Sequence, residues 1–171
     1  MDLYFDIGGT FFRCYTFNYD LFKELVKIEI EDNVLEQMKK YINLFLDSNI
    51  KIKNVLVSIA GIVDDNKIYG CMNAGLKDGT VLINNYNGIE VKYINDGDAF
   101  MLGEVIYNNI DYKRLNVLGI VFGTGVGCGL IVNGEIVKNV EIHKFFEKFL
   151  QNNNLTDENL DKVTEFISKD L

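Results

Sequence analysis

The chain has 171 residues, of which 48% are hydrophobic and 12% aromatic, and its formal net charge is −8. This size suffices for one large domain or two small ones with a self-supporting core, and the composition excludes extended disorder. Acidic residues along the whole length argue against a nucleic-acid backbone as partner, because such surfaces need clustered Lys and Arg; a nucleotide bound locally by backbone amides stays compatible with them.

The cysteine pattern and the N-terminus bear on the compartment of the protein. Cys14, Cys71 and Cys128 lie far apart and form no C-x-x-C pair. Neither a disulfide framework nor a zinc site is therefore expected, and reduced thiols are. The N-terminus enters a strand that contains Asp2 and Asp6 instead of a signal peptide, and no apolar run approaches a membrane span. We expect a cytoplasmic protein with no membrane partner.

Residues 2–30 predict three consecutive strands with a glycine turn at the first bend. Leu3-Tyr4-Phe5 leads into Asp6-Ile7-Gly8-Gly9-Thr10, the run 11–17 leaves this turn, and residues 24–30 alternate as a third strand. Adjacent glycines permit a tight turn and leave main-chain N–H groups open to phosphate oxygens, while Asp6 suits a hydrated Mg²⁺. An ordinary hairpin turn explains the same residues.

A helix and two buried strands are predicted next. Asn33 is the expected cap of a helix that ends near 47–49, with apolar residues at helical spacing: Val34, Met38, Tyr41, Ile42 and Phe45. Residues 55–59 predict a buried parallel strand that ends in Ala60-Gly61, and residues 89–94 predict another strand. Polar residues that include Asn73 follow Gly61. Loops at the carboxyl ends of such strands bind ligands in open α/β sheets.

Asn95 and Asp96 stand between strand 89–94 and a predicted helix over 99–109. The expected packing residues of this helix are Phe100, Leu102, Val105, Ile106 and Ile110. Polar side chains at such a junction converge on ligands, but an Asp or Asn ahead of a helix is also the commonest N-cap. We expect Asp98 to serve as the cap. On the residues alone, capping or a solvated loop is the favoured interpretation of Asp96.

The second glycine turn, Gly123-Thr124-Gly125-Val126-Gly127, repeats the plan of the first. Residues 117–122 enter it, Leu130-Ile131-Val132 leaves it, and Asn133-Gly134 turns into residues 135–137. The repetition suggests a duplicated architecture with two facing phosphate cradles. P-loop and dinucleotide fingerprints both fail, since no G-x-x-x-x-G-K-[ST] is present and a strand follows where a helix is required. Two helices are predicted beyond, over 140–150 and from Thr156.

Three motifs occur in the order and approximate spacing of the ROK family of sugar kinases: Asp6-Ile7-Gly8-Gly9-Thr10, Ile94-Asn95-Asp96 and Gly123-Thr124-Gly125-Val126-Gly127. The chain resembles this family from residue 2 to about residue 138, and the family belongs to the actin, hexokinase and heat-shock ATPase superfamily. The resemblance implies an α/β fold of the ribonuclease-H-like, actin-like ATPase type, with a mixed sheet and flanking helices. It also implies a complete first lobe over 1–115 and a partial second lobe over 116–171.

The resemblance further implies an ATP-dependent kinase of glucokinase type that phosphorylates a hydroxyl of a hexose, either glucose or an N-acetylhexosamine. Asp96 is the implied general base. Substrate contacts are implied for Asn95, Asn73, Gly61, Glu141 and His143. The implied contacts to ATP are Asp6, Gly8, Gly9, Thr10, Gly123, Thr124, Gly125 and Gly127, with Asp6 holding Mg²⁺ through water.

The sequence departs from the family pattern in several places. Ala60-Gly61 stands where the family usually has Pro-Gly, and Glu141-Ile142-His143 resembles a contracted Glu-Ile-Gly-His motif. His143 is explained more simply as a surface residue at the start of an amphipathic helix. The zinc loop and most of the second lobe are missing from the pattern, so no zinc is expected.

Two further functions and one assembly follow as alternatives. The first is a catalytically incomplete sugar-binding or interaction protein derived from such a kinase, since the nucleotide lobe lacks most of its expected length. The second, a transcriptional repressor of the same ancestry, fits worst, because a first strand that begins at residue 2 leaves no place for a preceding helix-turn-helix. Exposed apolar surface on a partial lobe predicts a homodimer.

Overall fold

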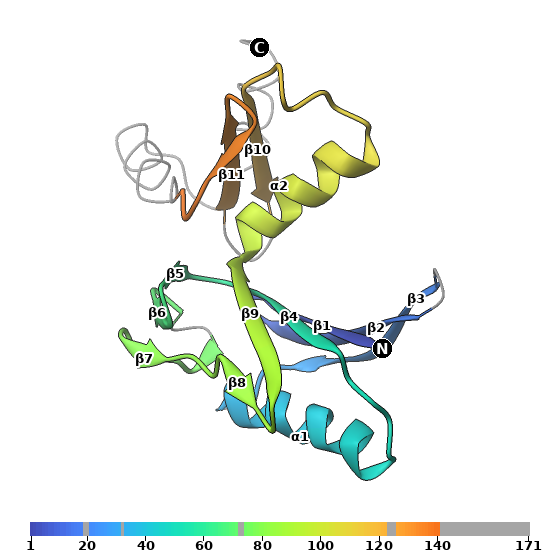
Figure 1. Ribbon diagram of the computed structural model, residues 1–171. Coiled ribbons are helices and arrows are strands. Elements are labelled where there is room, and N and C mark those ends of the chain that lie inside the picture. The colour runs from blue at the N-terminus through green and yellow to red at the C-terminus, as the bar shows by residue number, and fades with distance from the viewer. Residues whose placement is uncertain (19–20, 32, 72–73, 123–125, 141–171) are drawn as a thin grey trace. The chain divides into compact units, whose positions relative to one another are not determined.

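The computed structural model describes residues 1–18, 21–31, 33–71, 74–122 and 126–140 (Figure 1). Residues Met1–Val140 form one compact unit. The helices predicted over 140–150 and from Thr156 lie outside the described residues, and the expected boundary between 115 and 116 stays a prediction.

A six-stranded mixed sheet in the order β3-β2-β1-β4-β9-β8 is the largest element of this unit (Figure 1). Its strands are β1 (Asp2–Ile7), β2 (Phe11–Asn18), β3 (Leu21–Glu29), β4 (Asn54–Ile59), β8 (Asn85–Tyr86) and β9 (Ile89–Asn95). Strands β1, β4 and β9 run parallel, whereas β2, β3 and β8 pair antiparallel. This confirms the predicted meander, the predicted parallel strand over 55–59 and the predicted strand over 89–94. Strand β3 begins at Leu21 and not at Glu24, because its pairing with β2 continues past a register shift at Cys14/Tyr15 that breaks the alternation.

Helix α1 (Val34–Asp47) covers one face of this sheet, and its predicted apolar face is confirmed. Val34, Met38 and Ile42 are fully buried in the cluster that also contains the inward side chains of β1, β2 and β4. The ring of Tyr41 stacks on Phe12 with 5.5 Å between the centroids. Each large apolar side chain buried in this way contributes about 1.5–3 kcal/mol. Apolar burial therefore holds α1 on the sheet.

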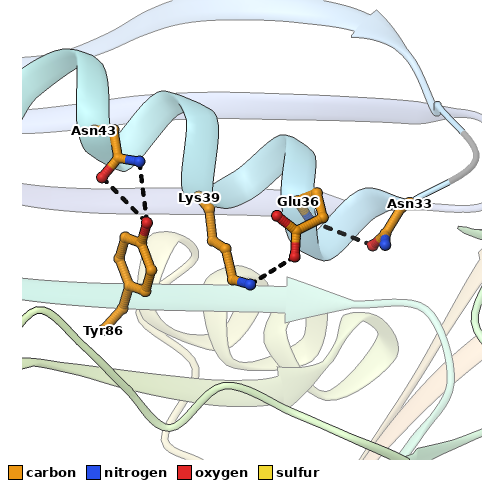
Figure 2. Close-up of polar contacts among 5 residues, drawn as sticks. All are labelled: Asn33, Glu36, Lys39, Asn43 and Tyr86. Atoms are coloured by element: carbon orange, nitrogen blue, oxygen red, sulfur yellow. Dashed lines mark hydrogen bonds and ion pairs between the residues drawn. The ribbon is translucent and has the colours of Figure 1, made fainter.

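Polar contacts fix the start of α1 and join the helix to Tyr86 of β8 (Figure 2). The Asn33 side chain accepts a hydrogen bond from the Glu36 backbone N–H at 3.3 Å, which confirms the predicted cap. Lys39 pairs with the Glu36 carboxylate one turn along. The Asn43 amide exchanges two hydrogen bonds with the Tyr86 hydroxyl, at 3.0 and 3.2 Å. Exposed ion pairs add little stability, so the Asn43–Tyr86 contact is the more useful anchor.

The first part of the segment between β4 and β9 forms a second sheet, with the order β5-β6-β7. Its strands are β5 (Ile62–Asp64), β6 (Lys67–Tyr69) and β7 (Thr80–Val81). Ile68 of β6 is fully buried and joins the core of the large sheet. The segment therefore starts at the carboxyl end of β4 and is anchored by its own apolar residue.

Helix α2 (Asp96–Tyr107) packs on a third sheet with a small core of its own. This sheet has the order β10-β11-β12, with β10 (Val117–Phe122), β11 (Val126–Val132) and β12 (Glu135–Val137). Both of its pairings are antiparallel, as the sequence predicts. The turn residues Asn133 and Gly134 have φ of 53° and 82°, as expected for a tight hairpin turn.

The inward face of α2 differs from the predicted one. Met101 and Val105 are buried, whereas Phe100 and Ile106, both predicted to pack, are 41% and 67% exposed. The reason is local space: a Cβ added at Gly129 would stand 2.5 Å from the Met101 Cβ, so the glycine makes room for this side chain. The helical spacing placed Val105 correctly, and the predicted Leu102 and Ile110 pack, partly buried, against the same core.

The start of α2 is also a correction. The helix begins at Asp96 and not at Ala99, and its N-cap is Asn95 and not Asp98. The Asn95 side chain accepts from the Asp98 backbone N–H at 3.1 Å, the usual geometry of a cap. Asp98 lies inside the first turn and is buried. Its carboxylate is not a cap, because it accepts a hydrogen bond from the distant Asn139 backbone N–H at 3.0 Å.

Candidate active site

The carboxyl ends of three parallel strands meet at one edge of the large sheet. Ile7 of β1 lies beside Ile59 of β4, which lies beside Asn95 of β9. The first glycine turn, residues 60–61 and Asp96 therefore leave the sheet from adjacent positions. Neighbouring strands are about 4.8 Å apart, so the glycine turn and Asp96 stand about 10 Å from each other. This edge is where open α/β sheets bind ligands.

Asp6 is the polar centre of the sheet face that points away from α1. Arg13 Nη1 donates to Asp6 Oδ2 at 2.6 Å, and Ser58 Oγ donates to Asp6 Oδ1 at 3.5 Å. Both partners are register neighbours of Asp6, on β2 and β4. The Asp6 side chain stays 36% exposed. The sequence motifs do not indicate Arg13 or Ser58. The strand pairing across the first hairpin places Arg13 opposite Asp6, and this pairing is the signal that could have found Arg13.

The first glycine turn is a hairpin turn whose Gly8 is not required by the fold. The Gly8 N–H donates to the Phe11 carbonyl at 3.1 Å, and the Thr10 carbonyl accepts from the Ile30 N–H at 3.1 Å. The φ of Gly8 lies outside the left-handed region, and among described atoms an added Cβ would meet only the Phe11 oxygen, at 3.8 Å. The expectation that Gly8 needs special backbone freedom is therefore wrong, because the turn closes without a positive φ at this position. Thr10 is exposed.

Gly61, in contrast, is required by the fold. Its φ is 132°, and an added Cβ would stand 2.7 Å from the Tyr69 carbonyl oxygen and 3.1 Å from the Cys71 Cβ. The Gly61 carbonyl accepts from the Asn95 side-chain amide at 2.8 Å. Gly61 is thus fixed beside the strand end that carries Asn95 and Asp96.

Asn95 and Asp96 differ in burial and in the hydrogen bonds that their side chains make within the protein. Asn95 is 4% exposed, and both ends of its amide are hydrogen-bonded, to the Gly61 carbonyl and to the Asp98 N–H. Asp96 is half-buried, and its Oδ1 accepts from the Gly97 N–H at 2.9 Å. The positive end of the α2 dipole stabilises a negative charge at this position.

The Cys71 thiol lies close enough to Asp96 for the charge of this carboxylate to affect its pKa. Burial raises the pKa of Cys71 to about 11, and the negative charge of Asp96 adds to the rise, while a hydrogen bond from the Ala74 backbone opposes it. Cys71 is 2% exposed and stays a neutral thiol at physiological pH. Cys71 is another neighbour of Asp96 that the sequence motifs do not indicate.

Several predicted site residues cannot be placed. Asn73, Gly123, Thr124, Gly125, Glu141 and His143 lie outside the described residues. Gly127 lies on β11 opposite Val121, with 3.9 Å between an added Cβ and the Val121 Cβ. Of the predicted site residues that are described, Gly8, Gly61, Asn95 and Asp96 come to one sheet edge, close to Asp6. That the two glycine turns face each other stays a prediction.

The described part of the chain shows neither a cluster of metal-ligating side chains nor a helix that could span a membrane. Within residues 1–140, gaps excepted, no three His, Cys, Asp or Glu side chains gather as metal ligands would. No helix in that part is both long and apolar enough to span a bilayer.

Comparison with known proteins decides the family. Residues 3–143 match the model of the ROK family. The chain belongs to the ROK family. It is 30% identical over 141 residues to an N-acetyl-D-glucosamine kinase of Mannheimia succiniciproducens, an alignment that covers 77% of this chain and 46% of the relative. A shorter alignment, 49% identical over 51 residues, covers 29% of this chain and 16% of an N-acetyl-D-glucosamine kinase of Yersinia enterocolitica.

A solved structure carries the same fold. The ROK family glucokinase of Streptomyces griseus, in complex with glucose and AMPPNP, superposes with a TM-score of 0.63 at 20% identity, covering 79% of this chain and 45% of the glucokinase chain. The predicted fold, an actin-like ATPase α/β fold with a mixed sheet, is confirmed. This ROK-family chain spans about half the length of the relatives it matches, 46% in the Mannheimia alignment.

Proposed function

We propose that this chain carries the sugar- and phosphate-binding part of an ATP-dependent ROK sugar kinase. Its acceptor is a hydroxyl of a hexose of glucose or N-acetylhexosamine type. One observation carries the proposal: the glycine turn after β1, the connection after β4 and Asp96 after β9 leave the sheet at one edge. The matched relatives are N-acetyl-D-glucosamine kinases by name, which supports this acceptor class.

Asp96 is the general base of the proposed reaction. Its carboxylate takes the proton of the attacking hydroxyl as that oxygen bonds to the γ-phosphorus of ATP, while the bond from this phosphorus to the bridging oxygen breaks and ADP leaves. The half-buried position at the start of α2 supports this role, because the carboxylate is held by the Gly97 N–H and is still partly accessible. The roughly 10 Å between the strand ends leaves room for a phosphoryl group and the acceptor hydroxyl.

The first glycine turn is the proposed phosphate cradle, with contacts from Gly8, Gly9 and Thr10. The space at Gly8 supports this, since neither φ nor any described neighbour demands glycine there. A missing side chain that the fold does not need is explained by close approach of a ligand to the backbone N–H groups. In the second turn, Gly123, Thr124, Gly125 and Gly127 remain proposed contacts by family resemblance.

Asp6 fits a magnesium ion held through water. Mg²⁺ keeps several waters and uses one or two carboxylates beside substrate phosphates. Asp6 offers one partly exposed carboxylate at the strand end, and its pairing with Arg13 at 2.6 Å disfavours a direct metal bond to the same oxygen. Bound Mg²⁺ would neutralise the charge of the phosphate groups during transfer.

The proposed sugar contacts are Gly61, Asn73, Asn95, Glu141 and His143. For Asn95, hydrogen bonds to the Gly61 carbonyl and the Asp98 N–H hold the amide at the strand end that carries Asp96.

The direct test is ADP release from the chain with Mg²⁺-ATP and a panel of hexoses. We expect sugar-dependent turnover that Asp96→Asn lowers by about a hundredfold or more, because general-base catalysis contributes about 10²–10⁴-fold. Asp64→Asn is the matched control, since Asp64 is an exposed carboxylate on the neighbouring strand β5. Equal rates for both variants would overturn the role of Asp96.

Calorimetry with the same sugars separates the alternative function. Sugar binding without turnover would favour a binding protein derived from a ROK kinase over an active kinase.

The proposed homodimer is tested by light scattering of the same sample, where a monomer at high concentration contradicts it. A cytoplasmic site of action also belongs to the proposal, in keeping with three buried cysteines present as thiols.

A further inference from the structure

A closed circuit of hydrogen bonds includes Asn95 and Asp98, which lie on either side of Asp96 in the sequence, and joins three separate segments of the chain. The Asn95 amide donates to the Gly61 carbonyl at 2.8 Å, and its oxygen accepts from the Asp98 N–H at 3.1 Å. The Asp98 carboxylate accepts from the Asn139 N–H at 3.0 Å. The Asn139 side chain then bonds both backbone groups of Val63, its Oδ1 accepting from the N–H at 2.9 Å and its Nδ2 donating to the carbonyl at 2.8 Å.

The circuit closes because Val63 lies two residues after Gly61. We call the five members, Gly61, Val63, Asn95, Asp98 and Asn139, the latch. Two of them flank Asp96 in the sequence and are themselves 4% and 1% exposed. Asn139 comes from a different part of the chain, just after β12, and its φ of 57° turns the backbone so that main chain and side chain point to different partners.

This geometry differs from ordinary packing in one respect. Asn139 pairs with Val63 in the two-bond manner of a neighbouring strand, although it lies 76 residues away and belongs to no strand. The latch therefore sets the separation between the start of α2, which carries Asp96, and the start of β5, which follows Gly61.

We propose that Asp98 and Asn139 are positioning residues that hold Asp96 at a fixed distance from the β4–β5 connection. The inference rests on the proposed kinase function for its catalytic consequence, but the mechanical coupling is a property of the free chain. Loss of the Asn139 side chain frees Val63 and, through Asp98 and Asn95, loosens both residues that flank Asp96. A base displaced by about 1 Å can cost about a hundredfold in rate.

The first test measures amide hydrogen exchange by NMR on the full chain. Asn139→Gly removes the side chain without backbone strain, because glycine accepts the positive φ. Asn133→Gly is the matched control, an identical change at a φ of 53° in the β11–β12 turn. Asn139→Gly removes both hydrogen bonds between the Asn139 side chain and Val63. We therefore expect faster exchange of the Val63 N–H and, across the latch, of the Asp98 N–H, by roughly threefold to tenfold each. Asn133→Gly should change neither.

Faster exchange at Val63 with no change at Asp98 would overturn the proposal, whatever the activity of the chain. Two substitutions at position 98 test the same link from the other side. Asp98→Asn keeps an acceptor oxygen for the Asn139 N–H, so the amide of residue 98 should exchange as slowly as in the parent chain. Asp98→Ala removes the acceptor, so the same amide should exchange faster. Equal exchange in both variants would also overturn the proposal.

Steady-state kinetics supply the catalytic readout. Asn139→Gly should lower kcat for sugar phosphorylation by about ten- to a hundredfold, with little change in the KM for ATP, while Asn133→Gly stays within twofold. An unchanged kcat in Asn139→Gly, with exchange at Asp98 accelerated, would overturn the positioning role. An inactive parent chain would instead count against the proposed kinase, and the exchange data would then decide the coupling alone.

Discussion

The six-stranded sheet with α1 and the smaller region of α2 with β10–β12 are held together differently. The first buries a continuous apolar cluster, to which α1 contributes Val34, Met38 and Ile42. The second buries only Met101, Val105 and Ile131 as its described core, and relies on close backbone approach and on the latch. A Cβ at Gly97 would collide with the Cys128 carbonyl, so the first turn of α2 lies directly on β11. The comparison teaches that apolar burial stabilises one region, whereas glycine contacts and polar pairs define the other, beside the proposed base.

The largest expected effect comes from the apolar core of the large sheet. Phe5 is 1% exposed, so Phe5→Ala should lower the free energy of unfolding by about 3–5 kcal/mol through lost burial and a cavity. Leu44 of α1 is 54% exposed, so Leu44→Ala should change the free energy of unfolding by about 0.5 kcal/mol at most. Urea denaturation measures both. A cost for Phe5→Ala as small as that for Leu44→Ala would contradict the role assigned to apolar burial.

The glycine of the first turn should affect binding and not stability. Gly8→Ala has ordinary space for its Cβ, so the midpoint of urea unfolding should stay close to that of the parent. If phosphate oxygens approach the backbone there, the KM for ATP should rise about ten- to a hundredfold, the cost of one hydrogen bond to a charged group. An unchanged KM would remove Gly8 from the proposed cradle.

The glycine at the start of α2 should show the opposite behaviour. Gly97→Ala should cost about 1–3 kcal/mol of stability, because the added methyl overpacks the contact with the Cys128 carbonyl. Gly103→Ala, in the same helix but with open space, should stabilise by about 0.5–1 kcal/mol. Thermal unfolding compares the pair. Equal melting temperatures would mean that the backbone of α2 does not rest on β11.

The smallest effect concerns the buried thiols, one in the core and one beside Asp96. Burial raises the pKa of Cys14 to about 12, and burial with the Asp96 charge raises the pKa of Cys71 to about 11, against 9.0 for an exposed thiol. Because both are raised, the stability they contribute is present below pH 9 and is lost as pH rises toward these values. At pH 9.5 each thiol should account for about 1 kcal/mol of lost stability.

Alanine variants test this pH dependence one thiol at a time. Unfolding by urea at pH 8 and pH 9.5 should show a smaller loss in Cys14→Ala and in Cys71→Ala than in the parent. A parent whose stability does not change between these two pH values would contradict the burial of both thiols as neutral groups.

The predictions from sequence succeeded where one element's own periodicity decides the outcome. The cap at Asn33, the inward face of α1, the parallel strand over 55–59 and the Asn133-Gly134 turn all follow from local pattern, and the structure confirms them. They failed at α2, where Met101 replaces Phe100 and Ile106 on the inward face. That choice depends on glycines of another element, and no helical spacing contains this information.

The sequence by itself determined the family, the mixed sheet and the residues that carry the motifs. The order of the motifs is visible along the chain, and apolar periodicity is visible within a single strand or helix. Only the tertiary structure decided which motif residues stand together, that Arg13 and Ser58 pair with Asp6, and that Asn139 reaches Val63 and Asp98. The physical reason is that strand register and backbone approach join residues far apart in the chain, and such contacts leave no periodic trace in either partner.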